Sequence, residues 1–192
     1  MEIIRIFVVV NRSLLSVQFY GEAEDAFTIL FEQWSDVEYL EDFFENNKAD
    51  LQSGFFGEIS VEEAVRVTID EAERLEEYVR RLARASKASR REQQLDFVFK
   101  DLKANDPSFQ LVKSKAYGVS KPSWLRIYAI RIAENLYVVS GGAIKLTKTM
   151  NDRQHLRDEL EKLECVKQYL INNGLISEAD YQCFELGRYD ER

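Results

Sequence analysis

Residues 124–148 read WLRIYAIRIAENLYVVSGGAIKLTK, and this stretch decides the expected fold. Its apolar and β-branched residues alternate with polar ones over 125–132 and again over 136–147, which predicts two strands. Only Ala133-Glu134-Asn135 separates them, so they should form an antiparallel hairpin. Because side chains alternate along a strand, Arg126 and Tyr128 are expected on one face, opposite a leucine and an isoleucine.

The second of these strands contains Ser140-Gly141-Gly142, followed at once by two lysines. Glycine lets a strand bend or bulge where a side chain would clash. Exposed amide groups beside lysines also suit an anion such as RNA phosphate. We expect the bend to bring Lys145 or Lys148 beside the face that carries Arg126 and Tyr128.

The remaining sequence predicts strands and helices in alternating blocks. Runs over 3–10 and 14–20, separated by Asn11-Arg12-Ser13, indicate a first hairpin. Ser60 followed three residues later by Glu63 forms a capping-box pattern and predicts a helix over about 61–82. Further elements are expected as helices within 22–47, at 95–102 and after Asn151-Asp152, and as a strand at 109–117.

This pattern predicts the α+β class: a small antiparallel β-sheet of about five strands with several α-helices packed against it. A chain of 192 residues with 45% hydrophobic residues can bury one sizeable core, so we expect a single compact domain over 1–192. Within it we distinguish an acidic β-hairpin and helical part (1–105), a basic sheet and helix (106–173) and a short C-terminal helix (177–186).

Charge is distributed unevenly along the chain. The net charge is −8, yet residues 1–99 hold 11 Lys and Arg against 21 Asp and Glu, whereas 100–170 hold 13 against 8. Two cysteines are too few for a disulfide framework, and no apolar run reaches the length of a membrane helix. We therefore expect a cytoplasmic protein that does not enter a membrane.

The apolar stripe of the helix over 61–82 has two interpretations. Its spacing alternates between four and three residues, which would suit a homodimer seam, although Thr68 and Ala72 are weak seam residues. Amphipathic helices more often bury such a stripe within their own chain, and this is the interpretation we favour.

The candidate functional residues are basic and aromatic and belong to one segment. The chain has no phosphate-binding GxxxxGK[ST] loop, no GxGxxG, GxSxG or HExxH motif and only one histidine, so neither a metal nor a cofactor is expected. A set of cations can hold phosphates through charge-assisted hydrogen bonds, and a tyrosine can stack on a base. The candidates are Lys121, Arg126, Tyr128, Arg131, Lys145, Lys148, Arg153 and His155.

Residues 124–163, WLRIYAIRIAENLYVVSGGAIKLTKTMNDRQHLRDELEKL, resemble the carboxyl-terminal half of the RelE/ParE superfamily of bacterial toxins, especially its HigB-like members. Arg126, Ile127 and Tyr128 match the first strand of that unit. The second strand and the basic loop before the helix are matched by Leu136, Val138, Val139, Gly142, Lys145 and Lys148.

The resemblance implies a small antiparallel sheet with helices on one side. It also implies a toxin of a toxin–antitoxin pair that cuts mRNA on the ribosome without a metal ion or poisons another target, or a derivative of such a toxin. Arg126, Tyr128, Lys145 and Lys148 would then be catalytic, and Lys121, Arg131, Arg153 and His155 would bind RNA. The implied partners are a cognate antitoxin and an mRNA or the ribosome. The alternative is a non-catalytic protein- or RNA-binding regulatory module with a toxin-like fold, in which the acidic 1–99 segment masks the basic surface or docks a basic partner.

Overall fold

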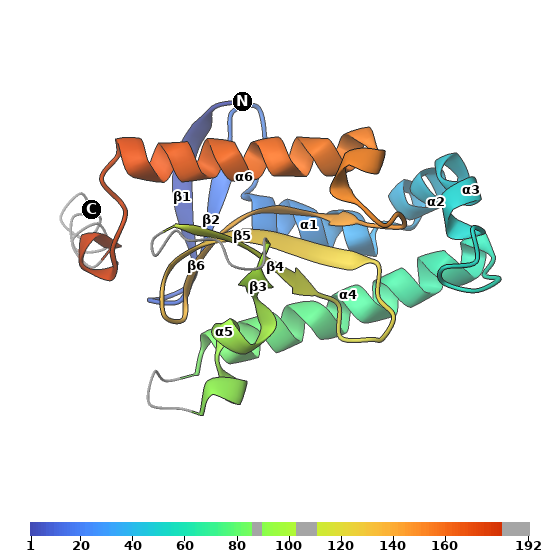
Figure 1. Cartoon of the computed structure of the whole chain (residues 1–192), viewed down its shortest axis with the longest axis horizontal. Helices are drawn as coiled ribbons and strands as arrows, with labels where there is room; N and C mark the ends of the chain where they lie inside the picture. Colours follow the sequence, from blue (N-terminus) through green and yellow to red (C-terminus); the bar gives the residue numbers. More distant parts are fainter. Residues whose placement is uncertain (86–89, 103–110, 182–192) are drawn as a thin grey trace.

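A computed structural model describes residues 1–85, 90–102 and 111–181 and contains one six-stranded sheet in the order β1-β2-β6-β5-β4-β3. Neighbouring strands run antiparallel except β2 and β6, which are parallel. Strands from the acidic and basic parts of the sequence therefore share one sheet (Figure 1). The strands are β1 (Ile3–Val10), β2 (Leu14–Phe19), β3 (Lys100–Asp101), β4 (Val112–Tyr117), β5 (Leu125–Ala133) and β6 (Leu136–Ile144).

Helices cover both faces of this sheet. The long helix α6 crosses one face, while α4 lies on the opposite side with α1 and α2 (Figure 1). The helices are α1 (Ala26–Ser35), α2 (Val37–Asn46), α3 (Lys48–Leu51), α4 (Val61–Ala83), α5 (Leu95–Val98) and α6 (Gln154–Asn172), with 3-10 turns η1 (Arg91–Gln93) and η2 (Met150–Asp152).

The α+β class is confirmed, and the sheet is mostly antiparallel as expected. Three details differ from the expectation. The helix expected at 95–102 ends at Val98, and Lys100–Asp101 form the short edge strand β3. The parallel β2–β6 pair makes the sheet mixed, because the chain returns from β5 to place β6 beside the first hairpin. Helices also lie on both faces, whereas the toxin resemblance implied one side.

Side chains of successive residues in β5 point to opposite faces of the sheet, which explains why two cores form. Leu125, Ile127 and Ala129 belong to the core beneath α1, α2 and α4. Tyr128, Ile130 and Ile132 belong to the second core beneath α6. Both sets are buried, so the central strand has no solvated face along most of its length.

Helix α4 begins where its capping signal predicts. The Ser60 hydroxyl accepts a hydrogen bond from the backbone N–H of Glu63 at 3.2 Å, and the helix starts at Val61. Its apolar stripe, including Val65, Leu75 and Val79, is buried in the first core. The stripe therefore packs within the chain, as we favoured over a dimer seam.

The glycine pair of β6 lies where two helices approach the same strand. β2 pairs with β6 only up to Val139, and beyond this point α1 takes the place of a neighbouring strand. A Cβ atom on Gly142 would lie 2.5 Å from the backbone oxygen of Arg126 and 2.7 Å from a methyl group of Leu30 in α1. Gly141 has a φ of +150° and lies beside a register shift between β5 and β6.

Parts of the predicted elements lie outside the described residues: the start of the 109–117 strand and residues 182–186 of the last helix. Within the described part, the last helix is represented by a helical turn at 178–181, where Asp180 accepts from the N–H and hydroxyl groups of Ser177. In the described ranges, no helix has the length and apolar character that crossing a membrane requires.

We predict that Gly142→Ala lowers the free energy of unfolding by about 1–3 kcal/mol, because the added methyl group collides with backbone as well as with Leu30. Urea denaturation of the two proteins measures this difference. An unchanged midpoint would show that β6 and α1 are not in the close contact described above.

Candidate functional site

A basic patch forms on the α6 face of the sheet, at the end of β5 that is remote from its hairpin. Arg126 of β5 lies opposite Tyr117 of β4 and Ala143 of β6, so these side chains share one face. Lys115 lies two residues along β4 on the same face. Lys145 follows β6 and lies close enough to Arg126 and Lys115 for their charges to lower its pKa. We call Lys115, Tyr117, Arg126 and Lys145 the basic patch.

Two of these cations lie against the aromatic ring of Tyr117. The guanidinium carbon of Arg126 lies 4.2 Å from the centre of the Tyr117 ring, and the ammonium of Lys115 lies 5.6 Å from it. Cations are attracted to the negative face of an aromatic ring, so this contact fixes the two side chains near each other. Tyr117 itself remains 43% exposed, which leaves part of its surface available to a ligand.

Backbone carbonyl groups orient the two central cations. Arg126 donates from Nη1 to the carbonyl oxygens of Ser123 at 2.8 Å and Leu125 at 2.7 Å. Lys145 donates from Nζ to the carbonyl oxygens of Thr147 and Lys148, the latter at 2.7 Å. The following loop therefore wraps around the Lys145 ammonium and holds it beside β5.

The pKa of Lys145 is lowered, chiefly because the side chain is partly buried and further because Arg126 and Lys115 are nearby cations. Burial also lowers the pKa of Arg126. Among the residues that the structure describes, none of the three cations forms an ion pair with a carboxylate. Asp152 acts on Lys145, and Glu71 on Arg126, as more distant opposite charges, so the positive charge of the patch is only partly compensated and an anion can neutralise it further.

Tyr128, predicted to stack on a base, lies inside the second core. Its side chain is fully buried, and its hydroxyl donates a hydrogen bond to the sulfur of Met150 at 2.9 Å. Burial raises its pKa strongly. The aromatic residue that reaches the surface beside Arg126 is Tyr117, which sequence reasoning placed at the end of a strand without assigning it a role. The sequence could have identified Tyr117 only through the cross-strand register, which requires knowing which strands pair.

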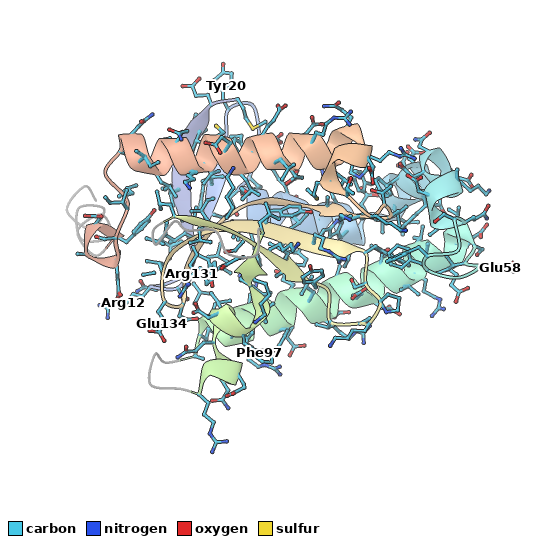
Figure 2. All side chains as sticks on the ribbon, viewed as in Figure 1. Arg12, Tyr20, Glu58, Phe97, Arg131 and Glu134 are labelled. Carbon is cyan, nitrogen blue, oxygen red and sulfur yellow. The ribbon has the colours of Figure 1, made fainter. Side chains whose placement is uncertain are left out.

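Arg131 lies at the hairpin end of β5 and on the other face of the sheet, near Glu134 (Figure 2). It forms an ion pair with Asp96 at 3.0 Å. Asp96 also accepts from the backbone N–H of Asn135 at 2.5 Å and from the hydroxyl of Tyr137 at 3.2 Å. This network joins α5 to the hairpin, so Arg131 is separated from the basic patch and engaged in the structure.

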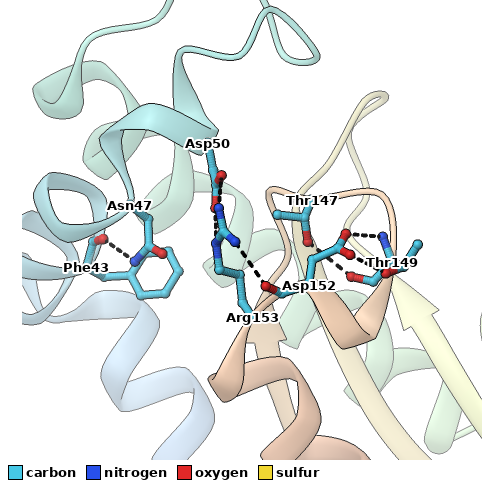
Figure 3. Close-up of polar contacts among 7 residues, drawn as sticks. All are labelled: Phe43, Asn47, Asp50, Thr147, Thr149, Asp152 and Arg153. Carbon is cyan, nitrogen blue, oxygen red and sulfur yellow. Dashed lines mark hydrogen bonds and ion pairs between the residues drawn. The ribbon is translucent and has the colours of Figure 1, made fainter.

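Arg153 is paired with the acidic part of the chain. It donates from Nε and Nη2 to the two carboxylate oxygens of Asp50, at 2.6 and 2.5 Å (Figure 3). Asp50 belongs to α3, more than a hundred residues earlier in the sequence. One predicted RNA-binding cation is thus neutralised in cis by the acidic region.

The remaining candidates, Lys148, Lys121 and His155, lie in different parts of the structure. Lys148 is exposed in the loop after β6, and Lys121 is exposed between β4 and β5. His155 lies in the first turn of α6, where Nε2 is 3.1 Å from the backbone oxygen of Ile144 and the ring packs edge-on against Phe43. The structure therefore gathers Arg126, Lys145 and Lys148 in one region and directs His155 elsewhere.

His155 faces a cavity of about 570 Å³ between α1, α2 and α6, floored by residues 141–144 of β6. Glu159, one helical turn after His155, lies at its wall and is 4% exposed. Burial raises the pKa of Glu159 to about 7, despite an ion pair with Lys162 at 2.7 Å. Sequence reasoning did not identify this site, because acidic residues on a helix are usually solvated.

In the described part of the chain, no cluster of three or more His, Cys, Asp or Glu side chains is arranged to hold a metal ion. Comparison with models of protein families, with curated proteins and with solved structures finds no match to this chain.

The raised pKa of Glu159 predicts an unusual pH dependence of stability. An unfolded glutamate ionises near its ordinary pKa of 4.5, whereas the folded one keeps its proton until about pH 7. Ionisation therefore favours the unfolded chain, and stability falls as pH rises between these values by about 3 kcal/mol at most. Glu159→Gln should remove this loss, so its unfolding free energy relative to wild type should increase with pH in urea titrations.

Glu164→Gln is the matched control on the same helix. Lys113 lowers the pKa of Glu164, whose side chain is half exposed. A lowered carboxyl pKa stabilises the fold above the unfolded pKa, and this contribution is lost as pH falls. The control should therefore cost most stability at neutral pH, the opposite slope; parallel slopes for the two variants would contradict the assignment.

Proposed function

We propose that this protein is a toxin-like component of a toxin–antitoxin system that binds and cleaves RNA at the basic patch, with mRNA in the cytoplasm as its target and a cognate antitoxin as its partner. The observation that carries the proposal is the convergence of Lys115, Arg126 and Lys145 beside the exposed ring of Tyr117. The resemblance of residues 124–163 to the RelE/ParE superfamily supports the same function.

The patch suits an RNA backbone with an unpaired base. Nη1 of Arg126 makes its two hydrogen bonds to the chain, while Nε and Nη2 make none to the residues that the structure describes. These donors, with the ammonium groups of Lys115 and Lys148, can contact phosphate oxygens. The exposed face of Tyr117 can stack on a base, an interaction that tolerates different sequences.

Cleavage can use the same side chains. Lys145, whose lowered pKa favours the neutral amine, would remove the proton of a ribose 2′-hydroxyl. The 2′-oxygen would attack the phosphorus, and Arg126 would stabilise the charged phosphorane. The bond to the 5′-oxygen would then break, and the ammonium of Lys115 would protonate this leaving oxygen, giving a 2′,3′-cyclic phosphate.

A second candidate function is RNA binding without cleavage, as a regulatory module. It is favoured by the hydrogen bonds that tie Arg126 and Lys145 to carbonyl groups of their own chain, because these bonds must loosen before either side chain can act in catalysis. The pairing of Asp50 with Arg153 also shows the acidic region already masking a cation.

Induction in a bacterial host tests the first function. We predict that wild type arrests growth and fragments transcripts, and that the Arg126→Ala, Lys145→Ala double variant does neither. Arg126→Lys keeps the charge and the stem, and should keep part of the activity if Arg126 acts through charge. The control is Arg5→Ala, Lys167→Ala, which removes equal charge from β1 and the far half of α6. Equal growth with wild type and the double variant would exclude an active toxin.

Binding to a labelled single-stranded RNA across a salt series tests the site itself. Loss of the Arg126 phosphate contact should weaken binding and reduce the slope of log affinity against log salt by roughly 0.7, because each contact releases counterions. The Arg5→Ala, Lys167→Ala control should leave the slope unchanged. Cleavage products that disappear in the double variant separate catalysis from binding, whereas equal slopes would remove the patch from the interface.

Tyr117→Ala tests base stacking. Loss of one stacked base costs about 1–3 kcal/mol, so affinity for single-stranded RNA should fall about 5- to 150-fold with little change in salt slope. Tyr20→Ala is a suitable control, because Tyr20 is 75% exposed and projects from the far end of β2 (Figure 2). Equal loss of affinity in the two variants would contradict a specific role for Tyr117.

A further inference from the structure

The cavity beside β6 contains a buried carboxyl group whose hydrogen-bond partners are incomplete. The carboxylate of Glu159 accepts at Oε1 from Lys162 at 2.7 Å, while Oε2 is buried and has no hydrogen-bond partner among the described residues. A buried oxygen without a partner costs free energy that a ligand carrying a donor can recover.

The geometry of Gly141 directs this oxygen toward the cavity. A Cβ atom on Gly141 would lie 2.5 Å from Oε2 of Glu159, and Gly141 is itself part of the cavity floor. Gly142 next to it is also bare, so the floor at these two positions is backbone without side chains. Oε2 is buried in this structure, so a small ligand in the cavity reaches it only after the Glu159 side chain turns away from Gly141.

The charges around the cavity favour a cation. Three carboxylates line it, from Glu22 before α1 and from Asp158 and Glu159 of α6, whereas Lys162 contributes a positive charge to the lining. The pKa of Tyr39 on α2 is raised, chiefly because the Tyr39 side chain is partly buried and also because Glu159 is close enough to act on it. An anionic ligand would be repelled by these carboxylates, whereas a cation would both supply N–H donors to Oε2 and favour the ionised form of Glu159.

The walls favour a flat group. Trp34 of α1, Phe43 and Tyr39 of α2 and His155 of α6 place aromatic rings around the same space. A guanidinium is planar, presents several N–H donors to a carboxylate and stacks on aromatic rings, whereas an ammonium is compact and strongly hydrated.

We propose that this cavity is a guanidinium-binding site, in which Oε2 of Glu159 accepts hydrogen bonds from the cation and the aromatic walls enclose its plane. The site is separate from the basic patch and does not depend on RNA binding. The cation is either a free small guanidine or the arginine side chain of a peptide, which present the same group.

The test uses the full chain and three probes with the same butyl chain: butylguanidinium, butylammonium and neutral butylurea, of which the first and third share a planar head group. Backbone amide NMR signals of Gly141 and Gly142 report on the cavity floor, and those of Gly54 and Gly174 serve as references outside it. We expect saturable shifts at Gly141 and Gly142 with butylguanidinium, weaker binding of butylammonium and none of butylurea. A blocked arginine amide that binds more tightly than butylguanidinium would identify a peptide as the source.

Two variants make the result specific. Glu159→Gln should weaken butylguanidinium binding at least about tenfold, while Glu164→Gln, with the same charge change on the same helix, should bind as wild type does. Gly141→Ala should also weaken binding, because its methyl group displaces Glu159.

Three outcomes would overturn the proposal: equal affinity of wild type and Glu159→Gln, equal binding of butylurea and butylguanidinium, or no saturable shift at millimolar probe. If Glu159→Gln does not fold, the probe series on the wild-type chain decides alone. In that case, binding of butylurea as tight as that of butylguanidinium refutes the site, and a clear preference for butylguanidinium supports it.

Discussion

The close approach of two helices to the bare backbone of β6 is the constraint on which the rest of the structure depends. Gly142 admits Leu30 of α1, and Gly141 admits the carboxylate of Glu159 from α6. A side chain at Gly142 would collide with the backbone of β5 and with Leu30, and one at Gly141 would displace the carboxylate of Glu159. Because both helices dock here, β6 can be a central strand with helices on each face while its edge beyond Val139 has no neighbouring strand.

This arrangement determines where charge can remain. Helix α6 covers the middle of the sheet, so Tyr128 and Ile130 are buried beneath it. Cations on the same face stay accessible only where the helix has not yet begun, at Arg126, Lys115 and Lys145. Lys113, two residues from Lys115 on the same face, already meets a carboxylate of α6, Glu164. The basic patch is thus the part of the sheet face that α6 leaves open, and its position follows from the start of that helix.

The acidic and basic parts of the chain act on each other within one sheet. Asp50 of α3 pairs with Arg153 at the start of α6, and Asp96 of α5 pairs with Arg131 of the β5–β6 hairpin. Both pairs compensate the charge of predicted RNA-binding cations, whose side chains remain partly exposed. The net charge of a segment therefore describes its free charge poorly, because ion pairs between distant segments decide which cations remain uncompensated.

Local signals in the sequence determined much of the secondary structure. The period of two in β5, the capping serine at Ser60 and the short Ala133-Glu134-Asn135 connection act over a few residues, and each was enough to place an element. The convergence of Arg126 with Lys145 was also predictable, since strand alternation and a glycine bend imply it. Only the tertiary structure decided that α6 buries Tyr128, that Tyr117 replaces it at the surface and that Glu159 faces a cavity. These outcomes depend on which strands pair and where helices cross them, and such contacts join residues too far apart in the chain for local chemistry to specify.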